Sequence, residues 1–308
     1  MATVSRFRLL NDAQWGLISG LLPSNEGRRG HPFGDDRRVV EGIIYRYRTG
    51  VPWRDLPRSE FGPWQTVWKR HRRYAGDGTW DRVLMDLLAT ADAEAKLDWT
   101  VSVDATINRA HQHATNTTRP EQDTGGSVEL QESAAGRHEP AGHGLGRSRG
   151  GLTTKIHTAV DGKGRPLAVV VTGGQRNDGA MLSTVLDEIV VPRIGAGRAR
   201  TRPDAVIADR AYTSGVARRM LRRRKITAVI PQKRDEIAAR ARRGSAGGRP
   251  PAFDETLYKQ RNLVERSFAL LKQWRALATR YDKLAIVYRA TVVLSACITW
   301  TRHIGDMP

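Results

Sequence analysis

The stretch YKQRNLVERSFALLKQWR, residues 258–275, has five Lys or Arg residues and a single acid, Glu265. Plotted as an α-helix at about 100° per residue, its polar side chains Tyr258, Arg261, Glu265 and Lys272 fall within roughly 60° of one another. The predicted buried face is opposite and consists of Leu263, Leu270 and Trp274, with Val264 and Leu271 beside them. The simplest interpretation is a surface helix in which Glu265 pairs with Arg261, a weak i,i+4 interaction.

Composition narrows the class of partner. The 308 residues include 51 Lys and Arg against 32 Asp and Glu, a net charge of +19, and 39% are hydrophobic. Such an excess of positive charge in a foldable chain is typical of a protein that binds a polyanion, with nucleic acid the first candidate. A membrane surface fits less well, because the basic residues are spread over segments with core-like apolar residues, and no apolar run of about 18 residues exists. One cysteine and no secretory signal indicate a cytoplasmic, nucleoid-associated bacterial protein.

Residues 1–97 are predicted to form a helical domain, because apolar side chains recur at helical spacing between capping signals. The third helix is expected within GPWQTVWKRHRRYAGDG, residues 62–78, with a basic outer face over aromatic core residues. This pattern is typical of a helix-turn-helix-like DNA-binding domain whose recognition helix enters the major groove. The candidate DNA contacts are Gln65, Lys69, Arg70 and Arg73. A structural helical cap with a solvated basic face is the alternative.

Residues 98–308 predict an α/β domain. Runs that read as strands lie at 99–110, on both sides of Asp161 and Gly162, at 205–208 and at 226–231. Helical patterns separate the later runs, so the predicted order is βββαβαβα, a mixed sheet with helices on its faces. The segment at about 114–150 is polar and is expected to be a flexible insert. In the basic stretch that follows residue 231, Lys233 and Arg234 are further candidates for DNA binding.

Three acids occupy particular places in this topology. Asp104 is predicted to end the first strand, Asp209 to end the fourth, and Glu265 to lie on the helix after the fifth. Adjacent strand ends of an open α/β sheet share one crevice, so these carboxylates are expected to form an all-oxygen site suited to two Mg²⁺ or Mn²⁺ ions. Arg261 and Lys272 would then hold DNA phosphates, and Tyr258 would hydrogen-bond or stack. Simpler roles stay open for two of the acids. Asp104 could be an N-cap or turn residue, and Asp209 could form an ion pair with Arg210.

The spacing of Tyr258, Arg261, Glu265 and Lys272 fits a signature Y-x2-R-x3-E-x6-K. In these residues the chain resembles the DDE transposases of bacterial insertion sequences, in the insertion-sequence-four and -five group and its five-like branch. SVDATINRAHQHA (102–114) resembles the segment around the first catalytic Asp of that family, and VIADRAYTS (206–214) the segment around the second. YRYRTGVPWRDLP (45–57) resembles part of its amino-terminal domain.

The resemblance implies an RNase H-like catalytic domain in which Asp104, Asp209 and Glu265 bind the metal ions. It implies double-stranded DNA as substrate, namely the terminal inverted repeats of the element and a target site, with a homodimer or higher multimer bringing the ends together. Water would free a 3′-hydroxyl, which then attacks target DNA, and no nucleotide cofactor is implied. Two alternatives remain: a domesticated, non-catalytic DNA-binding protein or repressor, and a general nuclease of the same fold.

Overall fold

The computed structural model describes residues 7–24, 34–116 and 139–305. Most of the polar insert predicted at about 114–150 therefore lies outside the described residues. The helices are α1 (Asp12–Ser19), α2 (Asp36–Thr49), α3 (Arg58–Phe61), α4 (Trp64–Gly76), α5 (Thr79–Ala93), α6 (Gln112–Thr115), α7 (Asp178–Asp187), α8 (Gly215–Arg223), α9 (Arg234–Arg242), α10 (Glu255–Tyr258), α11 (Asn262–Lys272), α12 (Arg275–Ala278) and α13 (Ala285–Gly305). The strands are β1 (Thr100–Ala110), β2 (Gly146–Ser148), β3 (Gly151–Val160), β4 (Pro166–Gly173), β5 (Ala205–Ala208), β6 (Thr227–Val229) and β7 (Thr279–Arg280).

The strands form one mixed sheet. Its main path is β2-β3-β1-β5-β6, with β4 also paired to β3 and β7 to β1. β3 runs antiparallel to β1 and β4, whereas β5 is parallel to both β1 and β6. β1, β3, β4, β5 and β6, together with α7, α8 and α11, give the βββαβαβα order that the sequence predicts, and β2 and β7 are additions to it.

Local signals set the ends of the helices. Asn11 caps α1 by accepting the backbone N–H of Gln14, and Gln14 in turn accepts the backbone N–H of Asn11. α2 ends where Gly50 adopts a left-handed conformation with φ of 78°, which glycine tolerates best. The predicted third helix is α4, and α1, α2 and α5 lie with it in the helical N-terminal region.

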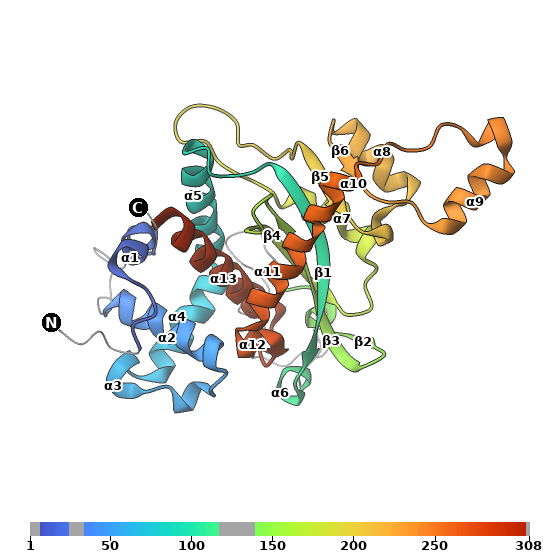
Figure 1. Ribbon diagram of the computed structural model, residues 1–308. Coiled ribbons are helices and arrows are strands. Elements are labelled where there is room, and N and C mark those ends of the chain that lie inside the picture. The colour runs from blue at the N-terminus through green and yellow to red at the C-terminus, as the bar shows by residue number, and fades with distance from the viewer. Residues whose placement is uncertain (1–6, 25–33, 117–138, 306–308) are drawn as a thin grey trace.

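Opposite faces of the sheet are covered by different helices. Val160 of β3 packs with Val264 and Phe268 of α11, and Figure 1 shows α11 lying along β1. Asp104 is paired across the strands with Thr158, two residues from Val160, so its side chain belongs to the face under α11. His157 points to the other face, where α7 packs. The period of two along a strand thus directs Asp104 toward the helix that carries Glu265.

The N-terminal helices and the sheet share one hydrophobic core. Figure 1 places α13 between them, and α13 contacts α1, α4 and α5 on one side and β4 on the other. Trp80 of α5 and Trp300 of α13 are fully buried in this core. Among the described helices, none is both long and apolar enough to span a bilayer.

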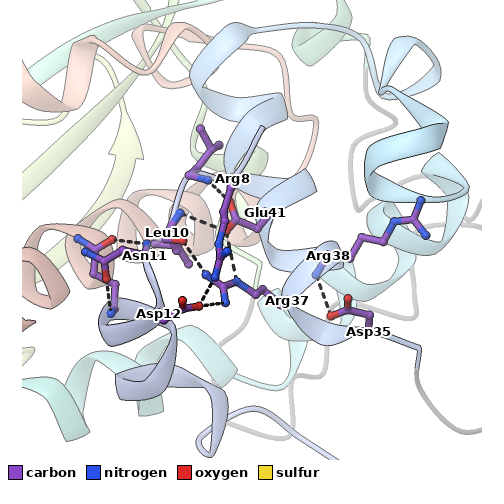
Figure 2. Close-up of polar contacts among 10 residues, drawn as sticks. Arg8, Leu10, Asn11, Asp12, Asp35, Arg37, Arg38 and Glu41 are labelled. Atoms are coloured by element: carbon purple, nitrogen blue, oxygen red, sulfur yellow. Dashed lines mark hydrogen bonds and ion pairs between the residues drawn. The ribbon is translucent and has the colours of Figure 1, made fainter. Parts of the chain in front are cut away.

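The segment before α1 is anchored to α2 by polar contacts, which Figure 2 shows. The buried carboxylate of Glu41 accepts the backbone N–H of Leu10 at 3.1 Å, and Arg37 donates to the carbonyl of Leu10 at 2.7 Å. Arg37 also pairs with Asp12 at 2.5 Å. Burial raises the pKa of Glu41, so its charge depends on these donors. They fix the start of α1 against α2.

The structure corrects two details of the predicted site helix and strand. Asp104 lies within β1 rather than at its end. The helix is also not continuous: α10 is joined to α11 by a 3₁₀ turn, Lys259–Arg261, and Trp274 follows α11 with an extended backbone. Within α11 the face that packs on β3 carries Val264 and Phe268, so Leu270, expected inside, is 56% exposed.

Candidate active site

The register of β1 and β5 brings Asp104 and Asp209 to the same end of this pair of strands. The parallel pairing of β1 with β5 ends where Val103 faces Ala208, and Asp104 and Asp209 are the next residues on each strand. β5 stops at this point, whereas β1 continues to Ala110. Asp104 therefore lies within its strand but directly after the parallel pairing. Asp209 also caps the 3₁₀ turn that follows, by accepting the N–H of Ala211 at 2.7 Å.

Arg261 links Asp104 to Glu265, the third acid of the predicted site. Its Nη2 donates to Oδ2 of Asp104 at 2.6 Å, and its Nη1 donates to Oε1 of Glu265 at 2.7 Å. The side chains of Arg261 and Asp104 are only 23% and 16% exposed, whereas that of Glu265 is 54% exposed. The i,i+4 pair expected from the sequence is present, but the more deeply buried contact of the guanidinium is with β1.

The charge of Asp104 is poorly solvated. Burial raises the pKa of its carboxyl, and the negative charge of Asp209 raises it further. The N–H of Ala105 and the guanidinium of Arg261 act in the opposite direction. A carboxylate in this position is stabilised by any added positive charge, which is the property expected of a cation ligand.

One residue near the acids, Tyr212, did not stand out in the sequence. Tyr212 is 1% exposed, and its hydroxyl has no hydrogen-bond partner within the described ranges. Burial raises the pKa of Tyr212, and the charges of Asp104, Asp178 and Asp209 raise it further. The hydroxyl of Tyr212 therefore lies in the negative field of carboxylates on β1, on α7 and directly after β5. The only sequence signal is a tyrosine three residues after Asp209.

His157 lies on the opposite face and is bound to neighbouring elements. Its Nε2 lies 2.9 Å from Oγ1 of Thr172, and its Nδ1 lies 3.8 Å from the carboxylate of Asp178. Burial lowers the pKa of His157 to about 4, so the ring is neutral near pH 7. Lys155 completes this cluster by donating to Asp178 at 2.9 Å.

The other residues predicted to contact DNA are not all gathered at the acids. Tyr258 packs on β5 and β6, and its ring centroid is 5.3 Å from that of Phe253. Lys272 is exposed near the far end of α11. Lys233 and Arg234 are exposed at the start of α9, which Figure 1 shows standing away from the sheet.

On α4, the candidate contacts divide into two groups. Gln65, Lys69 and Arg73 are exposed, as a DNA-reading face requires. Arg70 is only 6% exposed, pairs with Asp36 of α2 and donates to the hydroxyl of Tyr74 at 3.2 Å. Arg70 therefore joins two helices in this structure, and its predicted DNA contact is untested.

The acids have the chemistry of a divalent-cation site but are not gathered around a common point. Asp104, Asp209 and Glu265 offer only carboxylate oxygens, the donors that Mg²⁺ and Mn²⁺ prefer. In the part of the chain that is described, no three His, Cys, Asp or Glu side chains are close enough together to hold a metal ion. Arg261 instead neutralises Asp104 and Glu265. The donor set fits a hard cation in its chemistry, and Asp104 and Asp209 are the two acids that the strand register brings to neighbouring positions.

Comparison with known families agrees with this architecture. A family model described as "Transposase DDE domain" matches residues 95–300, and one described as "Putative transposase of IS4/5 family" matches residues 10–84. The fold and the family match define a transposase with an RNase H-like DDE domain that follows an N-terminal helical region. The chain belongs to the IS4/IS5 family of insertion-sequence transposases.

Individual relatives come from bacterial insertion elements. "Putative transposase for insertion sequence element IS402", from Burkholderia cepacia, is 34% identical over 163 residues, which are 53% of this chain and 69% of that protein. "Putative transposase for insertion sequence element IS6501", from Brucella ovis, is 31% identical over 152 residues, 49% of this chain and all (100%) of that protein. A crystal structure of a pre-cleavage Mos1 transpososome is a distant match, 12% identical with a TM-score of 0.24, covering 91% of this chain and 82% of that one.

Proposed function

We propose that this transposase binds the terminal inverted repeats of its own insertion sequence and cuts and rejoins DNA with Asp104, Asp209 and Glu265 as its catalytic acids. The observation that carries the proposal is the fork of Arg261, which ties the helix bearing Glu265 to Asp104 on β1, beside Asp209. Asp104 and Asp209 are far apart in sequence, yet each directly follows the last paired residue of the adjacent strands β1 and β5, and Glu265 is linked to Asp104 through Arg261. A structural role alone does not require acids at all three positions.

The reaction is hydrolysis followed by transesterification. Water attacks the phosphorus at the element end, the P–O3′ bond breaks, and a 3′-hydroxyl is released. That hydroxyl then attacks a target phosphodiester, forming a new P–O bond and releasing the target 3′-hydroxyl. One or two Mg²⁺ or Mn²⁺ ions would stabilise charge on the attacking and leaving oxygens. Asp104 and Asp209 would hold the ions with Glu265.

Arg261 has two proposed roles that compete for one guanidinium. In this structure both of its Nη groups are taken by carboxylates. The same groups are the donors that would bind a DNA phosphate, in the bidentate manner typical of arginine. Arg261 would therefore keep the acids neutralised in the free protein and hold DNA when a cation takes over that charge.

We also propose a division of labour between residues 1–97 and 98–308, in which the exposed side chains Gln65, Lys69 and Arg73 read the DNA ends. The shared core makes deletion of the N-terminal helices a poor test, because it would expose α13. Point substitution is sharper: Lys69→Gln with Arg73→Gln is expected to weaken binding to the repeats without lowering stability. Unchanged affinity for the repeats would argue against this face.

The test of the whole proposal starts with the DNA on either side of the gene, where short imperfect inverted repeats are expected. Purified protein with Mg²⁺ should produce 3′-hydroxyl ends at the repeat boundary on a plasmid that carries this DNA. Glu265→Gln should abolish cutting, and Glu255→Gln, an exposed acid in the first turn of α10, is the matched control. Repeat binding without any cutting in Mg²⁺ or Mn²⁺ would instead identify a non-catalytic DNA-binding protein.

A further inference from the structure

A second site lies under the C-terminal half of α11. A pocket of about 130 Å³ is enclosed there by α11, the β3–β4 hairpin, α13 and the end of α2. Gly164 of the hairpin turn, with φ of 81°, approaches the carbonyl of Leu263 so closely that an added Cβ would lie 3.2 Å from it. This contact holds the hairpin against α11.

The pocket concentrates positive charge without an acid. Arg48, near the end of α2, and Arg302, near the end of α13, both line it, and no Asp or Glu does so among the described residues. Neither arginine has a hydrogen bond or an ion pair to any part of the chain that the structure describes. Burial lowers the pKa of Arg48, and the charge of Arg302 lowers it further, so the two guanidinium groups repel each other.

Helix dipoles do not account for this arrangement. A cation in the last turn of a helix is favourable, which explains one arginine at the end of α2 and one at the end of α13. It does not explain why the two face one pocket. Arg48 is also held in place, because its guanidinium lies 5.7 Å from the ring centroid of Trp274.

A third, independent feature points to a ligand with acceptor oxygens. Thr158 lines the same pocket and is 3% exposed, yet its hydroxyl is buried and has no hydrogen-bond partner within the described ranges. An unsatisfied buried hydroxyl costs free energy that a bound acceptor would recover. Thr158 is also the cross-strand partner of Asp104, so the inner wall of the pocket adjoins the candidate active site.

We propose that this pocket is a second anion site, which binds a backbone phosphate of the DNA through Arg48 and Arg302, with the Thr158 hydroxyl as a further donor. Arginine is well suited to the ligand, because its planar fork matches phosphate oxygens. The choice of DNA over free phosphate rests on the proposed function: α11 forms one wall and carries Glu265. The site would hold the DNA backbone beside the C-terminal half of α11, whereas Arg261 lies at the start of that helix.

The test compares salt dependence of DNA binding. Wild type, Arg48→Gln/Arg302→Gln and the charge-matched control Arg193→Gln/Arg198→Gln are titrated with a duplex of the element end at several salt concentrations. The control arginines are exposed in the loop between α7 and β5 and do not line the pocket. One lost phosphate contact should make the slope of log K against log salt shallower by about 0.9 in the pocket variant only.

Other outcomes separate this proposal from the proposed function. If wild type binds DNA and both variants have its slope, the pocket takes no backbone phosphate and the proposal is overturned. The proposal fails in that case even if calorimetry shows inorganic phosphate binding to wild type, since the ligand is then free phosphate. No salt-dependent DNA binding by wild type would refute the proposed function itself. Arg48→Lys/Arg302→Lys, which keeps both charges, should retain the wild-type slope. A shallower slope in this variant would contradict a phosphate contact.

Discussion

Replacing Arg261 by Met should destabilise the protein chiefly through Asp104. The substitution keeps the apolar stem and removes both hydrogen bonds of the guanidinium. Removing one partner of a fully buried ion pair costs about 3–5 kcal/mol, whereas an exposed pair contributes about 0.2–1 kcal/mol. Arg261 and Asp104 are 23% and 16% exposed, between these limits but nearer the buried one. We therefore expect a loss of about 2 kcal/mol in the free energy of unfolding.

Glu265 should contribute little to that loss. Its side chain is 54% exposed, and an exposed i,i+4 pair contributes only about 0.3–0.5 kcal/mol. Urea unfolding of the single and double variants measures both couplings: Arg261→Met with Asp104→Asn, and Arg261→Met with Glu265→Gln. The first coupling should be about 1.5–2 kcal/mol and the second below about 0.5 kcal/mol. Equal couplings would refute the assignment of Arg261 chiefly to the strand.

Three further predictions concern buried groups. Asp161 is fully buried against Arg165, so Asp161→Asn should lower the free energy of unfolding by about 3 kcal/mol in urea titrations, and a loss below about 1 kcal/mol would contradict a buried charge pair. The unfolded chain protonates His157 near its usual pKa of 6.5 and the folded chain only near pH 4, so stability falls as the pH is lowered through this window. His157→Gln should reduce that fall by about 1.4 kcal/mol per pH unit, and an unchanged pH profile would mean that the folded protein holds the ring protonated. Tyr212→Phe should leave the free energy of unfolding unchanged or raise it by up to about 1–3 kcal/mol, because it removes a buried hydroxyl that has no partner in the described residues, and a loss of stability would reveal such a partner.

The sequence predicts the elements better than their contacts. Spacing places Tyr258, Arg261, Glu265 and Lys272 along one helical segment, and β-branched runs locate β1 and β5. Spacing does not indicate that Arg261 reaches Asp104, which is 157 residues away, because that contact depends on how α11 crosses β1. Its weaker link to Glu265, four residues along, follows from local geometry alone.

Burial is where prediction from the sequence fails most. Helical periodicity predicts Arg70 on the outer face of α4, but Asp36 on α2 draws it between the two helices, and periodicity carries no information about that partner. Leu270, predicted to be buried, is exposed because α11 packs on β3 through Val264 and Phe268, and the helical pattern alone does not show which apolar residues face the sheet. The apolar pattern of α13 predicts a buried helix but not that it packs on the N-terminal helices and β4 together.

The most direct measurement of the central claim compares the two acids that flank β5. Asp204 precedes the strand and pairs with Arg200, whereas Asp209 follows it at the candidate active site. Cleavage of end-bearing DNA in Mg²⁺ should fall by more than about a hundredfold in Asp209→Asn, because a ligand should matter more than the outer-shell groups that cost 10–100-fold. Asp204→Asn should cut at the wild-type rate. Equal rates for the two variants would contradict the assignment of the catalytic acids.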